Sequence, residues 1–192
     1  MIAMPADRPG PATYQDIIDL PETLTGEIID GELFVSPRPV SRHSLAVANL
    51  IFTLLGPFGR GLGGPGGWVF LIEPEVHLGA DVMVPDLAGW RRERLPPEEL
   101  PDYISITPDW ICETLSPSTA KRDRGIKLRA YLGHGVAHAW LIDPTAKTLE
   151  VFAADRARWA LVGVWGEGER VAAPPFDVAP FPITSLWSTG SP

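Results

Sequence analysis

Two acidic residues stand inside apolar stretches of the sequence, where a carboxylate is unexpected. Glu113 lies in the run WICETL (110–115), and Asp86 lies in VMVPDLAGW (82–90). A carboxylate in a buried strand is costly unless it is paired, hydrogen-bonded or bound to a metal. If the strands are neighbours, both acids can hold a hard cation such as Mg²⁺, which takes one or two carboxylates and accepts waters or substrate phosphate besides. The alternative is that each acid only accepts hydrogen bonds or pairs with an arginine.

Three other ionisable residues could join this pair. Lys127 is expected on the helix that follows the Glu113 strand, where its ammonium could turn back and stabilise charge on a phosphate. The alternative for Lys127 is an ordinary surface pair with Asp123, one helical turn earlier. His43 faces inward near the start of an earlier helix, as a ligand, a base or a satisfied core group. Glu32 ends a predicted hairpin, and it is either an outer contact of the site or a surface residue.

Other catalytic patterns are absent from the sequence. The cysteine and histidines lack zinc-site spacing. The glycine-rich stretch GRGLGGPGG (59–67) lacks the Lys-Ser/Thr of a phosphate-binding loop and precedes a strand. No GxSxG nucleophile motif occurs. These absences leave the two acids as the main candidates for chemistry.

The elements that must position these residues alternate between helix and strand. A short helix capped by Thr13 precedes a hairpin around Asp30-Gly31, because Asp-Gly accepts the positive φ angles of a tight turn. A helix from Ser41 to about 58 leads to two antiparallel strands, 68–78 and 82–90. Strand 110–115, a helix from Ser118 to about 132 and strand 137–143 predict a right-handed parallel crossover. The runs 148–154, 157–165 and 168–173 predict a C-terminal antiparallel meander, so the fold class is mixed α/β.

Length and composition predict one domain. The 192 residues, 45% hydrophobic and 21% charged, suffice for a single core spanning 1–192, with a loose tail over 1–11. The longest apolar stretch, 45–58, is too short to cross a membrane, and the N-terminus lacks signal-peptide features. The lone Cys112 cannot form an internal disulfide. We therefore expect a cytoplasmic protein that is not inserted in a membrane.

The charge distribution gives a mixed indication about nucleic acid. The net charge of −8 argues against nonspecific attraction to phosphate backbones. Basic residues nevertheless gather in two short stretches, which predict a locally basic surface for nucleic acid. Those we expect to contact nucleic acid are Arg91, Arg92, Arg94, Lys121, Arg122 and Arg124.

Several segments together resemble a known family. They are EIIDGELFVSPRPVSRHSLAVANL, VPDLAGW, the long stretch DWICETLSPSTAKRDRGIKLRAYLGHGV, AWLIDPTAKTLEVF and the final SLW. The chain resembles the PD-(D/E)XK nuclease superfamily, and within it the Uma family of restriction endonuclease-like proteins. The resemblance covers most of the chain.

The resemblance implies a fold, a cofactor and roles for particular residues. It implies a restriction endonuclease-like αβββαβ core with a mixed central sheet, here extended by the meander, and a bound Mg²⁺ or Mn²⁺. Pro85-Asp86 matches the family's PD, and Glu113 matches its second acid. The usual lysine position, two residues later, is Leu115, whereas Lys127 matches the helix-borne lysine of the Uma-like branch. Glu32 and His43 match recurrent positions, and a homodimer is a common assembly of such proteins.

The leading functional expectation is hydrolysis of DNA phosphodiester bonds. Asp86, Glu113 and the backbone carbonyl of Thr114 would hold the metal, Lys127 would position the attacking water or neutralise charge, and the basic stretches would hold the DNA backbone. A second reading is an inactive nuclease-like fold that only binds nucleic acid or a protein. A two-carboxylate glycosidase is disfavoured, because these acids belong to buried strands rather than to an open cleft.

Overall fold

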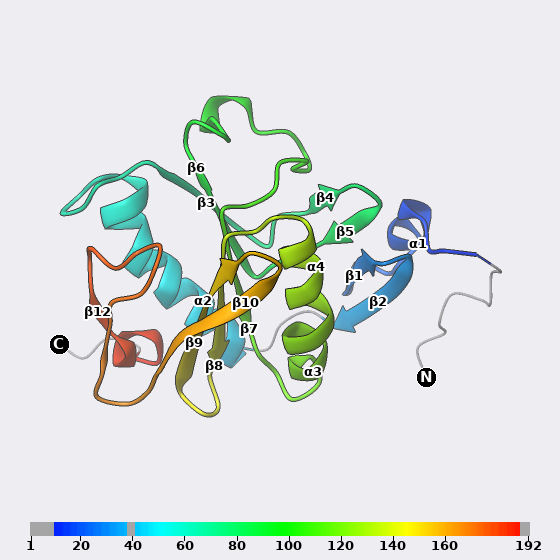
Figure 1. Cartoon of the computed structure of the whole chain (residues 1–192). Coiled ribbons are helices and arrows are strands. Elements are labelled where there is room, and N and C mark those ends of the chain that lie inside the picture. The colour runs from blue at the N-terminus through cyan, green and yellow to red at the C-terminus, as the bar shows by residue number, and fades with distance from the viewer. Residues whose placement is uncertain (1–9, 38–40, 189–192) are drawn as a thin grey trace.

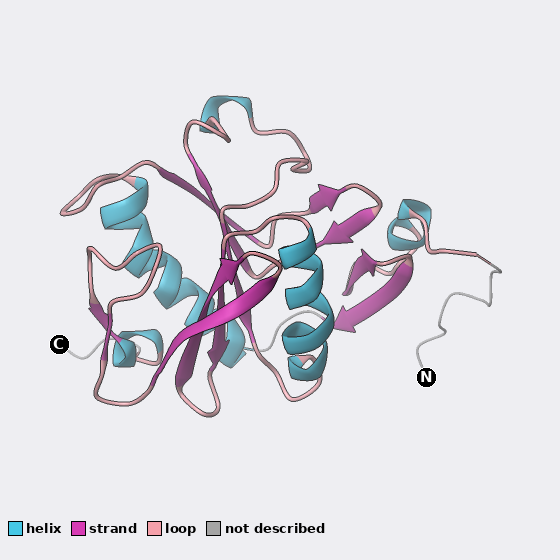
Figure 2. Ribbon diagram, viewed as in Figure 1, coloured by secondary structure: helices cyan, strands magenta, loops and turns pink. Residues whose placement is uncertain are grey.

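A six-stranded mixed sheet with helices on both faces forms the centre of the molecule (Figures 1 and 2). The computed structural model describes residues 10–37 and 41–188, so most of the predicted N-terminal tail, 1–9, lies outside the described residues. Helix α2 (Ser41–Leu54) covers one face, and the continuous helical segment α3 (Ala120–Arg122), η3 (Asp123–Lys127) and α4 (Leu128–Gly133) covers the other. This arrangement confirms the mixed α/β class.

The strand order of the large sheet is β10-β9-β8-β7-β6-β3. The strands β7 and β8 are parallel, and the helical segment 120–133 connects them as the predicted crossover. All other neighbours in this sheet are antiparallel. Every residue of β7 is buried, which explains why its sequence reads as a nearly continuous apolar run. The bounds are β3 Trp68–Ile72, β6 Leu87–Arg91, β7 Trp110–Thr114, β8 His138–Asp143, β9 Thr148–Asp155 and β10 Arg158–Trp165.

The two long strands predicted over 68–78 and 82–90 are each divided in two, which corrects the expected boundaries. β4 (Val76–Leu78) and β5 (Asp81–Met83) separate from β3 and β6 at Pro74 and Pro85. Proline cannot donate a ladder hydrogen bond, so a central strand tends to end there. The freed hairpin joins a second sheet of order β2-β1-β5-β4, with β1 at Leu24–Ile29 and β2 at Glu32–Pro37. The pairing of β1 with β5 brings the N-terminal hairpin to the large sheet.

The hairpin between β1 and β2 forms as predicted. Asp30 and Gly31 have φ angles of 53° and 76°, and Ile29 pairs with Glu32 across the turn. Positive φ at both central residues matches the right-handed twist of the strands. The short helix α1 (Tyr14–Ile18) packs over Gly26 of β1, where an added Cβ would lie 2.6 Å from the side chain of Leu20.

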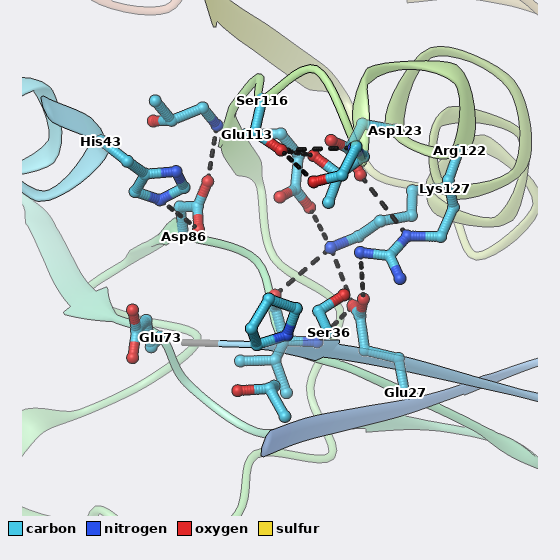
Figure 3. A pocket seen from close by; sticks show the side chains of 16 residues that line it. Glu27, Ser36, His43, Glu73, Asp86, Glu113, Ser116, Arg122, Asp123 and Lys127 are labelled. Atoms are coloured by element: carbon cyan, nitrogen blue, oxygen red, sulfur yellow. Dashed lines mark hydrogen bonds and ion pairs between the residues drawn. The ribbon is translucent and has the colours of Figure 1, made fainter. Parts of the chain in front are cut away.

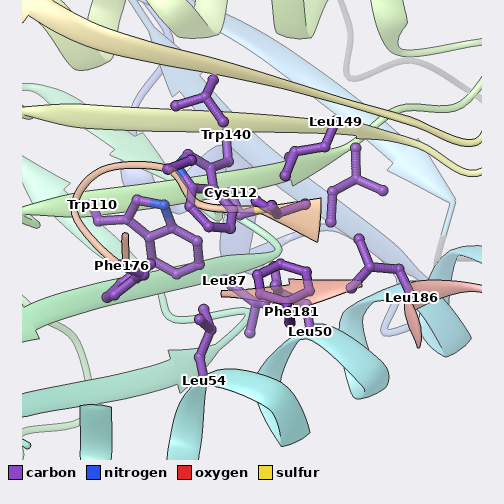
Figure 4. Close-up of a cluster of buried hydrophobic side chains, with 14 of the residues drawn as sticks. Leu50, Leu54, Leu87, Trp110, Cys112, Trp140, Leu149, Phe176, Phe181 and Leu186 are labelled. Atoms are coloured by element: carbon purple, nitrogen blue, oxygen red, sulfur yellow. The ribbon is translucent and has the colours of Figure 1, made fainter. Parts of the chain in front are cut away.

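Two hydrophobic cores lie on the two faces of the large sheet. Alternate residues of β7 face opposite cores: Trp110 and Cys112 pack on the α2 side, whereas Ile111 packs on the α4 side. Figure 4 shows the α2 side, where Leu50 and Leu54 meet the aromatic side chains of the sheet. The helix α2 passes into a π-helical turn, η1 (Leu55–Gly59), so the predicted helix extends to the expected end.

The C-terminal region departs from the predicted three-stranded meander. β9 and β10 pair as expected, but β11 (Arg170–Val171) pairs with β12 (Phe181–Pro182) rather than with β10. The reason is burial, since Val171 and Phe181 both belong to the core beneath α2. Two short 3₁₀ helices complete the described chain, η2 (Pro97–Glu99) and η4 (Ile183–Leu186). Among the described residues, no helix combines the length and hydrophobicity needed to cross a bilayer.

Candidate functional site

A pocket of about 150 Å³ lies where the end of the large sheet meets the second sheet and the start of two helices (Figure 3). Its wall combines residues from β1, β7, α2 and the helical segment 120–133 with the loop before β6. The charged and ionisable residues that line it are Glu27, His43, Glu73, Asp86, Glu113, Arg122, Asp123 and Lys127. The two acids singled out in the sequence therefore line one cavity.

Asp86 is positioned by the pairing of β6 with β7. Leu87 pairs with Cys112, so Asp86, one residue before β6, lies next to the end of β7. The backbone N–H of Thr114 donates to Oδ2 of Asp86 over 2.6 Å. Oδ1 lies 2.9 Å from Nε2 of His43 in the first turn of α2. The structure thus brings the predicted Asp86, His43 and Thr114 together.

Glu113 is buried at the same end of β7, with 3% of its surface exposed. Its Oε1 accepts a hydrogen bond from the hydroxyl of Tyr131 over 2.7 Å and lies 2.8 Å from Nζ of Lys127. Sequence analysis did not identify Tyr131. The one sequence feature that indicates Tyr131 is its position four residues after Lys127. This spacing places both side chains on the helix face toward the sheet.

Lys127 points into the pocket and is not a surface residue. It is 2% exposed, and its Nζ lies 2.8 Å from Oε1 of Glu27 as well as from Glu113. Nζ also donates to the carbonyl of Val84 over 3.3 Å. The helix makes a π-helical turn over Asp123–Lys127, and both end residues of that turn are buried. Such turns are frequent at functional sites, and this geometry replaces the surface pair considered for Asp123 and Lys127.

Glu27, which sequence analysis missed, occupies the place expected for Glu32. Glu27 is 3% exposed on β1, and its Oε1 accepts the N–H of Val84 over 2.9 Å. Glu32 is exposed on β2 near the turn and does not line the pocket. The signal for Glu27 was an acid directly before two isoleucines in a strand. Only the pairing of Ile28 with Val82, distant in sequence, shows that this acid reaches the site.

Burial, together with the excess of acidic groups in the pocket, shifts the pKa of Glu113 and of Lys127. Burial raises the pKa of Glu113 to about 8; the ammonium of Lys127 opposes this rise, and the neighbouring carboxylates add to it. Burial alone would lower the pKa of Lys127, but the carboxylates of Glu113 and Glu27 raise it above its usual value. Lys127 is therefore charged, and the carboxyl of Glu113 holds a proton to a higher pH than an ordinary glutamate does.

These donors fit a hard divalent cation. Among the described residues, no three His, Cys, Asp or Glu side chains form a ready cluster of metal ligands. Mg²⁺ does not require one, because it commonly takes one or two carboxylates and completes its shell with waters and phosphate. Asp86 and Glu113 supply two carboxyl groups to the lining of this pocket. Burial, and after it the neighbouring carboxylates, raise the pKa of Glu113, and a bound cation would oppose both effects by stabilising the ionised form.

The two basic stretches lie at different ends of the molecule. Arg122 lines the pocket, 3.5 Å from Oε2 of Glu27, and Lys121 and Arg124 are exposed on the same helical segment. The stretch 91–94 follows the far end of β6, away from Asp86, and Figure 1 shows the excursion after β6 on the opposite side from α3. There the guanidinium of Arg91 lies over the Trp68 ring and Arg94 pairs with Asp109. The structure does not bring this stretch to the pocket.

Comparisons with known proteins agree with the geometry. The model of the Uma2 family, described as "Putative restriction endonuclease", matches residues 11–179. A solved structure from Anabaena variabilis, described as a "putative nuclease belonging to DUF820", is similar over 92% of this chain and 98% of that chain, with 26% sequence identity and a TM-score of 0.75. No curated protein matches the chain.

Proposed function

The chain belongs to the Uma2 family, and we propose that its pocket is the site of a metal-dependent endonuclease that hydrolyses DNA phosphodiester bonds, with a PD-(D/E)XK-type arrangement. One observation carries the proposal. Asp86, directly before β6, and Glu113, on β7, line the same pocket as Lys127, whose ammonium lies 2.8 Å from Glu113. Two carboxylates beside a buried amine suit a site that must hold a cation and also stabilise the charge of a phosphate.

Asp86, Glu113 and the backbone carbonyl of Thr114 would hold Mg²⁺ or Mn²⁺. The N–H of Thr114 faces Asp86, and in a strand the N–H and C=O of one residue point to the same side. The next N–H, of Leu115, donates to Ile142 of β8 on the opposite side. The carbonyl of Thr114 is thereby directed toward Asp86. When bound, the cation would lower the pKa of a water and polarise the phosphate.

The residues around the carboxylates would orient the reacting groups. The contact of Lys127 with Glu27 fixes its ammonium beside Glu113, where it can hold a water or a phosphate oxygen. The hydrogen bond from Tyr131 holds the Glu113 side chain in one orientation. Arg122 adds a second positive charge to the pocket wall, suited to the DNA backbone.

Incubation of supercoiled and single-stranded DNA with the protein, across a range of Mg²⁺ and Mn²⁺ concentrations, tests this function. Wild type should nick or degrade DNA only with metal. Asp86→Asn and Glu113→Gln should abolish cleavage yet stay folded, since the amide oxygens can still accept from Thr114 N–H and Tyr131 hydroxyl. Undiminished cleavage by either variant would remove that residue from the mechanism. Metal binding without any cleavage would favour the binding-module reading.

A further inference from the structure

The pocket contains hydrogen-bond donors that no described residue satisfies. Nε2 of His43, Oγ1 of Thr114 and Nε of Arg122 are all buried and lack a hydrogen-bond partner among the described residues. All three residues line the pocket. A buried polar atom without a partner costs folding free energy, so such atoms commonly have a functional explanation. Each of these atoms can donate a hydrogen bond, so together they favour binding of an anion. The nearby carboxylates favour binding of a cation.

The hydroxyl of Thr114 lies on a different side of the site from the Glu113 carboxylate. Side chains alternate along β7, with Trp110 and Cys112 in the core beneath α2 and Glu113 bonded to Tyr131 of α4. The Thr114 side chain points to the same face of the sheet as those of Trp110 and Cys112, and therefore faces α2. It is 2% exposed, so its hydroxyl has little access to bulk water.

His43 lies on this same α2 side. Its Nε2 is 2.9 Å from Oδ1 of Asp86, near enough for electrostatic attraction, but it forms no hydrogen bond with that oxygen. His43 also belongs to the first turn of α2, which has no acidic residue. The positive end of a 14-residue helix therefore lies at this wall and favours a negatively charged ligand.

Arg122 approaches from the opposite wall of the pocket. Its guanidinium is 3.5 Å from Glu27, and its Nε is 3.7 Å from Oδ1 of Asp123, which is too long for a hydrogen bond. The Arg122 side chain is thus held near two carboxylates while its Nε–H remains available.

We propose that Thr114, His43 and Arg122 form an anion subsite that holds the oxygens of a nucleic-acid phosphate beside Asp86 and Glu113. The subsite rests on the proposed function, since it places the substrate phosphate in the same pocket. Donors from separate elements suit a phosphate, which offers several strong acceptor oxygens in different directions. Because its ligands would be phosphate oxygens, the subsite would contact the nucleic-acid backbone and not the bases.

The test compares Thr114→Val, which removes only the hydroxyl, with Thr114→Ser, which keeps it. The matched control is Thr53→Val, because the Thr53 hydroxyl already donates to the carbonyl of Asn49 outside the pocket. The probe is a fluorescent single-stranded DNA oligonucleotide, with Ca²⁺ in place of Mg²⁺ so that binding is measured without cleavage. Thr114→Val should weaken binding about tenfold, and Thr114→Ser and Thr53→Val less than about twofold.

Melting temperature without ligand gives the second readout. Thr114→Val should melt at the wild-type temperature or above it, because it removes a buried hydroxyl that has no partner. Thr53→Val should melt lower, because it removes a hydrogen bond that the structure shows. A lower melting temperature for Thr114→Val would show that its hydroxyl is structural and would overturn the subsite.

The outcomes separate the subsite from the nuclease proposal. If wild type binds the oligonucleotide and Thr114→Val weakens that binding, the subsite stands, even if no condition produces cleavage. If Thr114→Val binds as tightly as wild type, the subsite is overturned, even if wild type cleaves DNA. Absence of oligonucleotide binding by wild type overturns it as well.

Discussion

Charge imbalance is the main chemical property of the pocket residues. Five acidic side chains line the pocket with two basic ones, and most of these groups are buried. Such an arrangement costs folding free energy, because neighbouring buried carboxylates repel one another and are poorly hydrated. A divalent cation would relieve the repulsion, so the site should be more stable with its metal than without it. The groups are Glu27, Glu73, Asp86, Glu113 and Asp123, against Arg122 and Lys127.

The raised pKa of Glu113 predicts a pH-dependent response to metal. Its pKa rises from 4.5 to about 8, so between these values folded Glu113 holds a proton that the unfolded chain has released. Stability from this group is therefore lost as pH rises through the window toward 8. Because the cation must displace the same proton, apparent Mg²⁺ affinity should fall below pH 8, by up to about tenfold per pH unit.

Melting curves with and without Mg²⁺, recorded across this pH range, measure both effects. The Glu113→Gln variant has no proton to lose, so its stability relative to wild type should increase from about pH 5 to about pH 8. Its melting temperature should also respond little to Mg²⁺. A wild-type Mg²⁺ response that is the same at low and high pH would contradict the role of Glu113.

Loss of the Lys127 ammonium should be strongly destabilising. Lys127→Met keeps the chain length but leaves Glu27 and Glu113 buried without their shared partner. Removal of one partner from a buried ion pair costs about 3–5 kcal/mol. Urea unfolding should show a loss of this size, and Mg²⁺ should restore part of it by neutralising the carboxylates. Lys121→Met, exposed on the same helical segment, is the control and should change stability by less than about 0.5 kcal/mol.

Sequence and structure agree on the residues whose signal is local. Asp86 and Glu113 were recognisable because each interrupts an apolar run, and Lys127 because it follows on a helix. Glu27 gave no such signal, since its role depends on the pairing of β1 with β5, about 54 residues apart at Ile28 and Val82. Tyr131 resembled an ordinary core aromatic. Its bond to Glu113 depends on the packing of α4 on the sheet.

At the scale of elements, the division of the strands at Pro74 and Pro85 builds the site. It frees the β4–β5 hairpin to pair with β1, which then carries Glu27 under the helical segment 120–133. The sequence predicted the two strand runs but not the breaks within them, because a proline also fits the edge of a longer strand. The N-terminal hairpin is thus part of the pocket wall.

The Asp30-Gly31 turn provides a test of this hairpin. Gly31 has a φ of 76°, and an added Cβ would lie 3.0 Å from Cβ of Pro11. Gly31→Ala should therefore lower the free energy of unfolding by about 1–2 kcal/mol, measured by urea denaturation. Gly133→Ala is the matched control, since its Cβ would meet nothing within 4 Å at the end of α4. That variant should be neutral or stabilising by up to about 1 kcal/mol. Equal losses in both variants would contradict the strain at Gly31.

At the scale of the whole molecule, two expectations depend on surfaces rather than on the pocket. The homodimer stays a prediction. An edge strand can pair with a second copy, and β10 is an edge strand of the large sheet, with Leu161 57% exposed. Light scattering measures the assembly. The net charge of −8 opposes DNA binding, so any binding must come from local groups and from bound metal. The sequence located the basic stretches but not their places in the fold.

The position of the basic residues predicts which of them DNA contacts. Residues 91–94 begin at the end of β6 opposite Asp86, about 16 Å away along a five-residue strand, whereas Lys121 and Arg124 flank Arg122 at the pocket. The double variants Arg92→Ala/Arg94→Ala and Lys121→Ala/Arg124→Ala each remove two positive charges; Arg92, Arg94 and Arg124 each form an ion pair in the structure. Long-range electrostatics is therefore matched between them.

A difference between the two variants reports the position of the lost charges, together with the additional ion pair of Arg92. Loss of Lys121 and Arg124 should weaken binding of a single-stranded oligonucleotide by about fivefold or more and reduce the salt dependence by about 0.7 for each lost phosphate contact. Loss of Arg92 and Arg94 should change affinity by less than about twofold, because these side chains already pair with Glu98 and Asp109. Anisotropy titrations at several salt concentrations measure both quantities. Equal losses would mean that DNA extends along β6 from the pocket to the far end of the sheet.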